Sequence, residues 1–256
     1  MHMAAADARA HDRVEFMGLA FHVQPFEALI DGLIARSTRP GYGFVVTPNV
    51  DHVNKFHTGG VDRDTYLAAE IMVNDSKILE ALASRVNKTL PATPGSDIVS
   101  ALLHHPNAKD IRFAVVGPTP DDFALLKAKF PDLQLEFVPA AARLERGSEN
   151  WQNVLDAVLD QKFDILLCCI SFPKQEYLSY DLGQAGCTLG LSICAGASID
   201  FLTGRQKRAQ QIFQTLRAEW LYRLLGNPRR LARRYLIEGP RIFRLFWSLE
   251  KRKPQA

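Results

Sequence analysis

The sequence has no apolar run of the roughly 20 residues that a membrane-spanning helix needs. Residues 1–13 also lack the apolar core of a signal peptide, so we expect a disordered start to the chain and a cytoplasmic protein. Cysteine is scarce, and none of the four residues has zinc-ligand spacing: Cys168, Cys169, Cys187 and Cys194. They lie in or beside apolar runs, which favours buried free thiols over a disulfide framework.

Several nucleotide-binding signatures are also missing. No Gly-x-Gly-x-x-Gly follows the first apolar strand, which argues against a dinucleotide-dependent oxidoreductase. No helix-turn-helix, RNA-recognition aromatic motif or zinc knuckle is present, so a nucleic-acid partner is not expected. His52, His104 and His105 lack a metal-like or triad-like context, and we interpret them as structural or exposed.

The net charge of +3 conceals a strong asymmetry. Residues 205–256 contain fourteen Lys and Arg against three Asp and Glu, a net charge of +11. The remainder carries 17 basic and 25 acidic residues, a net charge of −8. A basic tail on an acidic body predicts a phosphate-bearing partner, such as an anionic membrane surface or a diphosphate substrate.

Apolar runs alternate with helical patterns along most of the chain. The runs at 43–47, 111–117, 133–138, 164–171 and 188–195 predict strands. Helical patterns are expected at 64–72, 97–104, 121–129 and 150–161, and Ser96 is a plausible N-cap for the second. This alternation predicts an α/β, Rossmann-like core at 14–203 with a mostly parallel sheet and helices on both faces.

The segment 204–256 has a different character. Large apolar residues at helical spacing are interleaved with cations, and Gly226-Asn227-Pro228 and Gly239-Pro240 punctuate the pattern. We expect a basic helical C-terminal appendage suited to a membrane surface.

Four segments in this order resemble the WecG/TagA/CpsF glycosyltransferase family. They are Thr47-Pro48-Asn49, Pro-Lys-Gln-Glu at 173–176, Asp-Phe-x-x-Gly-x-x-Lys-Arg-Ala at 200–209, and Glu-Trp-Leu-Tyr-Arg at 219–223. Pro94-Gly95-Ser96-Asp97 and Val116-Gly117 add to the resemblance, which covers about residues 14–236.

The resemblance implies an inverting, metal-independent transferase without a cofactor. It would move a hexose or N-acetylhexosamine from a UDP-sugar to a polyprenyl-diphosphate-linked saccharide in bacterial surface-polysaccharide synthesis. It further implies that the appendage closes over the active site and docks the enzyme on the inner face of the cell membrane. Self-association into a homo-oligomer is a further implication.

Asp75 is the acidic residue that the resemblance marks as the general base. A carboxylate there would accept the proton of the attacking acceptor hydroxyl. Its alternative role is to cap the helical pattern that follows it. Thr47 and Asn49 end the first strand, where Asn49 offers an amide donor and acceptor to a ligand or caps the next helix.

Residues near Asp75 depart from the family pattern. Asn74 and Ser76 stand where Ala and Gly are usual, and Ala92 replaces an Arg that could contact phosphate. The resemblance places Asn74, Gly95 and Asp97 on the acceptor side. These departures affect how the acceptor would be held. An alternative interpretation is that the protein is a catalytically impaired member of the family that binds nucleotide-sugar or acts as a scaffold in the same pathway.

The donor is expected to lie at other strand ends. Gly117 ends a strand in a turn that suits a nucleotide. Lys174 can meet phosphate and Gln175 can hydrogen-bond a sugar or uracil edge, whereas the alternative for both is a solvated loop. Asp200 is predicted to bind uracil or ribose, or to cap a helix.

The tail is expected to stabilise the leaving diphosphate. Negative charge grows on UDP as the glycosidic bond breaks, and without a metal ion guanidinium groups would have to balance it. The candidates are Arg208, Arg223, Arg230 and Arg233.

Overall fold

A computed structural model describes residues 12–141, 143–204 and 239–250. The predictions for residues 1–11 and for Arg208, Arg223, Arg230 and Arg233 lie outside the described residues. Within them, no helix is long and apolar enough to cross a bilayer.

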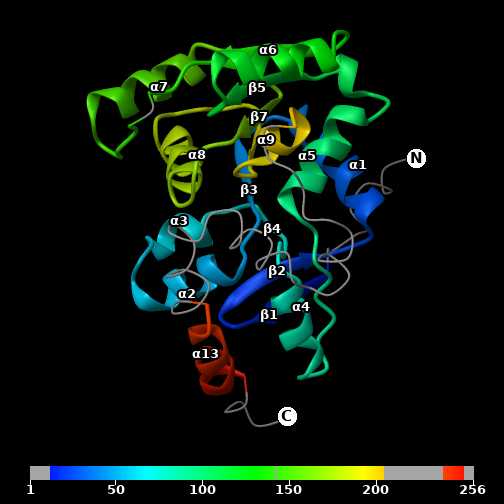
Figure 1. Cartoon of the computed structure of the whole chain (residues 1–256), viewed down its shortest axis with the longest axis vertical. Coiled ribbons are helices and arrows are strands. Elements are labelled where there is room, and N and C mark those ends of the chain that lie inside the picture. The colour runs from blue at the N-terminus through cyan, green and yellow to red at the C-terminus, as the bar shows by residue number, and fades with distance from the viewer. Residues whose placement is uncertain (1–11, 142, 205–238, 251–256) are drawn as a thin grey trace, which may run out of the picture.

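A six-stranded parallel sheet forms the centre of the molecule (Figure 1). Its strands, in spatial order, are β4 (Ile71–Met72), β3 (Gly43–Val46), β8 (Leu191–Cys194), β7 (Ile165–Cys168), β5 (Arg112–Val116) and β6 (Gln134–Val138). The chain runs outward from β3 to β4, crosses to β5 and β6, and returns through β7 to β8. The predicted Rossmann-like, mostly parallel sheet is therefore confirmed.

The central strands are buried on both faces because they consist almost entirely of apolar residues. All four residues of β3, β7 and β8 are buried. Successive side chains point to opposite faces, so Leu167 packs in one core and Leu166 in the other. Two helical layers are needed to cover such a sheet.

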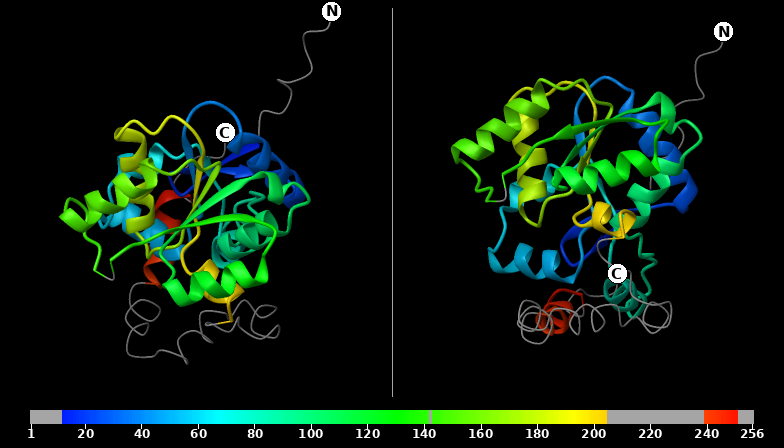
Figure 2. Two further views of the ribbon diagram at one scale, coloured as in Figure 1. Left: turned by 90° about the horizontal axis from the view of Figure 1, so that it is seen from above. Right: turned by 45° about the horizontal axis from the view of Figure 1, so that its top comes forward.

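Helices supply both layers, as the two views in Figure 2 show. One face packs against α1 (Phe26–Ser37), α5 (Gly95–His104) and α6 (Pro120–Lys129). The other packs against α7 (Glu149–Leu159) and α8 (Lys174–Gln184), and towards β4 against α2 (Val50–Thr58), α3 (Arg63–Leu67) and α4 (Lys77–Ser84). A short 3-10 helix, η1 (Ala108–Asp110), precedes β5, and α9 (Ser198–Leu202) follows β8.

Two sequence predictions about these elements are wrong. The helix expected at 64–72 ends at Leu67, and the chain then forms the edge strand β4. Ser96 does not cap α5, since the helix begins at Gly95 after Pro94. The proline fixes an extended backbone before the helix, which lets the helix begin without a side-chain cap.

An antiparallel hairpin and the C-terminal helix pack together beside the β4 end. The hairpin joins β1 (Asp12–Phe16) to β2 (Leu19–Val23) through Met17 and Gly18, which both have positive φ. Helix α13 (Arg241–Leu249) lies against α2 (Figure 1), and Ile242 and Phe246 enter the same core as the hairpin. Glu250, which follows α13, accepts hydrogen bonds from the Met17 amide and from Lys88, both at 2.7 Å.

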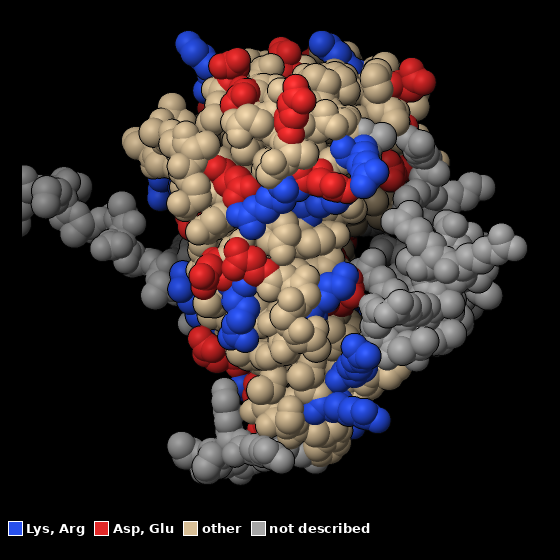
Figure 3. Space-filling model, turned by 90° about the vertical axis from the view of Figure 1, so that its left-hand side faces the viewer, with Lys and Arg blue, Asp and Glu red and all other residues tan. Residues whose placement is uncertain are grey.

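Acidic and basic side chains are interspersed on the face shown in Figure 3. Ion pairs between acidic and basic side chains occur in the described part of the chain, such as those of Arg146 with Asp62 and Asp181. Within the part of the chain that the structure describes, this face therefore presents mixed charge rather than a field of one sign.

Candidate functional site

Most of the predicted site residues that the structure describes lie along one edge of the sheet. Carboxyl ends of parallel strands point the same way, and ligands of such sheets bind there. Thr47 and Asn49 follow β3, Asp75 follows β4, and Gly117 follows β5. Lys174 and Gln175 begin the helix after β7, and α9, which contains Asp200, follows β8.

Asp75 lies at the centre of a hydrogen-bonded cluster at the β4 end. Its Oδ1 accepts the backbone N–H of Gly95 at 3.1 Å, and its Oδ2 accepts the Asn49 side-chain amide at 3.4 Å. The Asp75 backbone N–H donates to the Pro48 carbonyl at 3.0 Å. These contacts fix the direction of a half-buried carboxylate that keeps access to solvent.

The capping alternatives for Asp75 and Asn49 have different outcomes. Asp75 does not cap α4, because the Ser76 hydroxyl accepts the N–H groups of Ile78 and Leu79. Asn49 does cap α2, since its Oδ1 accepts the Asp51 N–H at 3.0 Å. The cap fixes the orientation of the Asn49 amide, so that its NH₂ group faces Asp75.

Close packing joins the β3, β8 and α5 ends. The buried Thr47 hydroxyl donates to the Cys194 carbonyl at 3.0 Å. A Cβ on Gly95 would lie 3.1 Å from Thr47 Oγ1 and 3.4 Å from Ala195 Cα. The absence of a side chain at Gly95 therefore favours the approach that brings its amide to Asp75.

Asn74 has a mainly internal role. It is 1% exposed, and its amide NH₂ donates to the carbonyls of Ser76 and Leu90, both at 3.1 Å. Its Oδ1 accepts the Ser76 N–H at 2.8 Å. Asn74 thus ties the loop that carries Asp75 to the segment before α5.

Lys174 and Gln175 belong to the first turn of α8, so the alternative of a solvated loop is wrong for both. Gln175 is 3% exposed, and its Oε1 accepts the Gly196 N–H at 2.7 Å. Its Nε2 donates to Glu176 Oε1 at 2.8 Å. Lys174 is half-buried and forms no ion pair within the described ranges, which leaves a cation at this edge for an anionic ligand.

Two predicted donor residues lie farther along the edge. Gly117 has φ +116°, and a Cβ there would collide with the Cys169 carbonyl at 2.4 Å. Asp200 is the third residue of α9, so it does not cap that helix. Between β4 and β5 lie four strand spacings of about 4.8 Å, so Gly117 is roughly 19 Å along the edge from Asp75.

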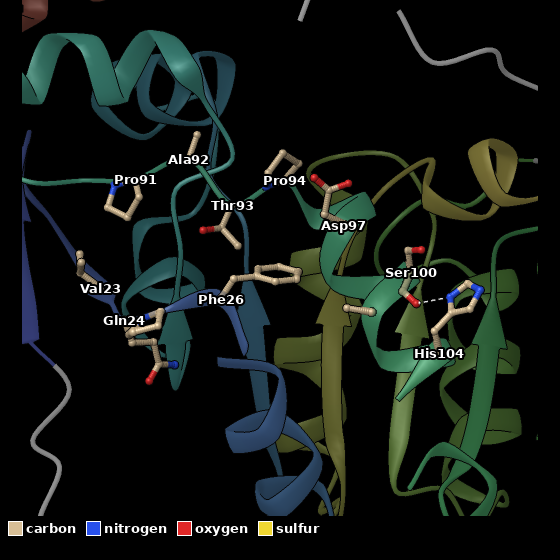
Figure 4. Close-up of a pocket in the computed structure, with 12 residues that line it drawn as sticks. Val23, Gln24, Phe26, Pro91, Ala92, Thr93, Pro94, Asp97, Ser100 and His104 are labelled. Carbon is tan, nitrogen blue, oxygen red and sulfur yellow. Dashed lines mark hydrogen bonds between the residues drawn. The ribbon is translucent and has the colours of Figure 1, made fainter. Parts of the chain in front are cut away.

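A cavity of about 1040 Å³ opens at the start of α5, where the Gly95 amide binds Asp75, and Figure 4 shows the residues that line it. Asp97 lies on its α5 wall, two residues after Gly95. The Phe26 ring lies between the 91–94 segment and α5. The lining residues are Val23, Gln24, Pro25, Phe26, Pro91, Ala92, Thr93, Pro94, Asp97, Ser100, Ala101 and His104.

This lining combines apolar surfaces with a few polar groups, and it contains no Lys or Arg among the residues that the structure describes. A pocket of that composition suits a neutral ligand with hydroxyl groups better than a phosphate.

A model of the WecG/TagA/CpsF glycosyl transferase family matches residues 14–256, which is nearly the whole chain. The chain belongs to this family. It is a glycosyltransferase, so its partners are in general a nucleotide-activated sugar and a saccharide acceptor.

Sequence reasoning assigned no role to Glu176 or Gly196 of this glycosyltransferase. It interpreted His52 as structural or exposed, and the structure shows His52 to be buried. Glu176 is fully buried, and desolvation raises its pKa to about 7. His52 stacks on Phe172 at 3.8 Å, and its Nδ1 lies 3.0 Å from the Tyr66 hydroxyl. Gly196 accepts the positive φ of the β8–α9 turn. The sequence feature that could have indicated a buried Glu176 is the position of a charged residue within the apolar pattern of a helix.

The cysteines agree in part with the sequence interpretation. All four are free, but only Cys168 and Cys194 are buried, whereas Cys169 and Cys187 are half-buried. Desolvation raises the pKa of Cys169 to about 12, so this thiol stays protonated and unreactive at neutral pH. Among the described residues, no three His, Cys, Asp or Glu side chains are grouped to hold a metal ion.

Proposed function

We propose that this glycosyltransferase moves a hexose or N-acetylhexosamine from a UDP-sugar to a polyprenyl-diphosphate-linked saccharide, with inversion at the anomeric carbon. The observation that carries the proposal is the Asp75 carboxylate, which Gly95 and Asn49 hold beside the start of α5. The same end of α5 lines a cavity of about 1040 Å³ through Pro94 and Asp97. Such a carboxylate can take the proton from an acceptor hydroxyl as that hydroxyl attacks the donor sugar.

The acceptor saccharide occupies the cavity beside Asp75. Asp97, Ser100 and Thr93 offer hydrogen-bonding groups, and Phe26 offers an apolar face to a sugar ring. Within the described ranges no Lys or Arg lines the cavity, and Ala92 stands on its wall. The lipid diphosphate of the acceptor would therefore lie outside the cavity, towards the basic tail.

The donor extends along the carboxyl edge of the sheet. The uridine lies towards Gly117 and Asp200, while the transferred sugar lies near Thr47, Asn49 and Asp75. The span of roughly 19 Å between the two ends is comparable to an extended nucleotide-sugar. Lys174 lies after β7, between those ends, where it can contact the diphosphate.

The leaving UDP is stabilised by cations rather than by a divalent metal. The candidates remain Arg208, Arg223, Arg230 and Arg233, which belong to a segment with a net charge of +11. Guanidinium groups match the geometry of phosphate oxygens and keep their charge at every physiological pH.

Helix α13 supports docking on an anionic membrane. Its buried side holds Ile242 and Phe246, whereas Phe243 and Trp247 are 48% and 47% exposed. These two are four residues apart and share a face of the helix, which Arg244 flanks. An apolar and cationic face of this kind binds the interface of a bilayer that contains acidic lipids.

The proposal is tested by incubating the protein with a panel of UDP-sugars and synthetic polyprenyl-diphosphate saccharides, with EDTA or with Mg²⁺. Transfer in EDTA, with an inverted anomeric configuration in the NMR spectrum of the product, is expected. Retention of configuration, or an absolute requirement for Mg²⁺ or Mn²⁺, would refute the mechanism.

A further inference from the structure

Glu176 is a buried carboxyl group that the proposed mechanism does not use. Its side chain is fully inaccessible, and its Oε2 has no hydrogen-bond partner among the residues that the structure describes. An apolar side chain at this position would avoid the desolvation of a carboxyl group. A native structure that keeps such a group calls for a reason.

A side-chain hydrogen bond joins this carboxyl group to Gln175. Glu176 Oε1 accepts from Gln175 Nε2 at 2.8 Å. His52 Nδ1 is 3.9 Å from the same oxygen, which is longer than a hydrogen bond, and lies nearer the Tyr66 hydroxyl. The main effect of the Glu176 carboxyl group is therefore to orient the side-chain amide of Gln175.

Both neighbours of the Gln175 amide select the same orientation. The Gly196 N–H can only donate, so it requires the Gln175 oxygen, while Glu176 Oε1 requires the NH₂ group. Without the Glu176 acceptor, the buried NH₂ group would lose this partner. One of the two hydrogen bonds that orient the Gln175 amide would then be missing.

The oriented amide in turn holds the turn at the end of β8. Gly196 adopts φ +55° there, and the preceding Ala195 lies beside Gly95, whose N–H binds Asp75. We propose that Glu176 is a positioning residue for sugar transfer, which fixes the Gln175 amide and through it the β8–α9 turn. This inference rests on the proposed function, because it concerns the same site.

The test is a double-mutant cycle of Glu176→Leu and Gln175→Leu, with kcat/KM for transfer as the readout. Each single variant should lower kcat/KM by about tenfold or more, which is the loss expected from a misplaced group near the reacting atoms. The double variant should fall little further, because Glu176 acts through Gln175. Thermal unfolding of each variant shows that it is folded.

Rescue separates positioning from packing. Glu176→Gln keeps an oxygen acceptor of the same shape and should restore most of the kcat/KM lost in Glu176→Leu. Wild-type kcat/KM in Glu176→Leu, or additive losses in the double variant, would overturn the inference. If Glu176→Leu does not fold, Glu176→Met replaces it in the same cycle, since methionine adapts to irregular cavities.

The controls distinguish this inference from the proposed function. If the wild-type protein transfers sugar and the cycle is additive, only the role of Glu176 is wrong. If the wild-type protein transfers no sugar from any UDP donor to any lipid-diphosphate acceptor, the proposed function itself fails.

Discussion

Replacing Gly95 with alanine tests the packing on which the Asp75 cluster depends. The new Cβ would lie 3.1 Å from Thr47 Oγ1, which is closer than ordinary van der Waals contact. Thr47 cannot easily move, because its buried hydroxyl donates to the Cys194 carbonyl. We therefore expect the start of α5 to shift by a few tenths of an ångström.

That shift weakens the hydrogen bond from the Gly95 N–H to Asp75 Oδ1. A hydrogen bond to a charged group contributes about 1.5–3 kcal/mol. If most of that contribution to the placement of Asp75 is lost, kcat/KM falls by about 10- to 100-fold, because 1.4 kcal/mol corresponds to about a factor of ten. The crowding should also lower the free energy of unfolding by about 1–3 kcal/mol.

The assay is steady-state transfer with a saturating UDP-sugar, combined with urea unfolding. Gly32→Ala is the matched control, because a Cβ at this α1 position meets no heavy atom within 4 Å. It should leave transfer unchanged and raise the free energy of unfolding by up to about 1 kcal/mol. A folded Gly95→Ala variant with wild-type kcat/KM would refute the proposed packing.

Two further predictions concern stability and membrane binding. The folded pKa of Glu176 is about 7 against an ordinary 4.5, so its contribution to wild-type stability should fall as pH rises from 4.5 to about 7. In urea unfolding, this loss should lower the free energy of unfolding of the wild-type protein by roughly 3 kcal/mol between pH 4.5 and pH 7.5. Glu176→Gln should not show the loss, and a variant with the same pH dependence as the wild type would contradict the raised pKa. Replacing Phe243 and Trp247 with serine should weaken sedimentation with anionic vesicles, whereas Leu125→Ser, at another exposed apolar position, should not. Equal sedimentation of the wild-type protein, the variant with serine at 243 and 247, and Leu125→Ser would exclude α13 as the membrane contact.

The core strands were predictable because parallel strands buried on both faces are continuous apolar runs. The runs at 111–117 and 164–171 contain β5 and β7, and each observed strand is shorter by one or more residues at either end. The segment 64–72 was predicted wrongly because its apolar residues fit a helical period. Its last two residues instead pair with β3 alone at the edge of the sheet.

The site was predictable in part, because residues that follow parallel strands must meet at one edge. That geometry brings Asn49, Asp75 and Gly95 together, as their hydrogen bonds show. The cavity could not be predicted in the same way. Phe26, Ala92 and Ser100 come from three separate segments, and no local pattern indicates that they share a wall.

The central claim is that the Asp75 carboxylate acts as the base in sugar transfer. Asp75→Asn keeps the size of the side chain, and its carbonyl oxygen can still accept the Gly95 N–H. Its NH₂ group would then face the NH₂ group of Asn49, which cannot turn without losing its cap on α2. Both the lost base and this mismatch act on catalysis rather than on the distant uridine end of the donor.

The most direct measurement is therefore kcat for transfer by Asp75→Asn, with the Kd for UDP determined by calorimetry on the same sample. A general base contributes about 10²- to 10⁴-fold, so kcat should fall by at least about a hundredfold while the Kd for UDP stays within about threefold of the wild-type value. Unchanged turnover in a variant that binds UDP normally would remove Asp75 from the mechanism.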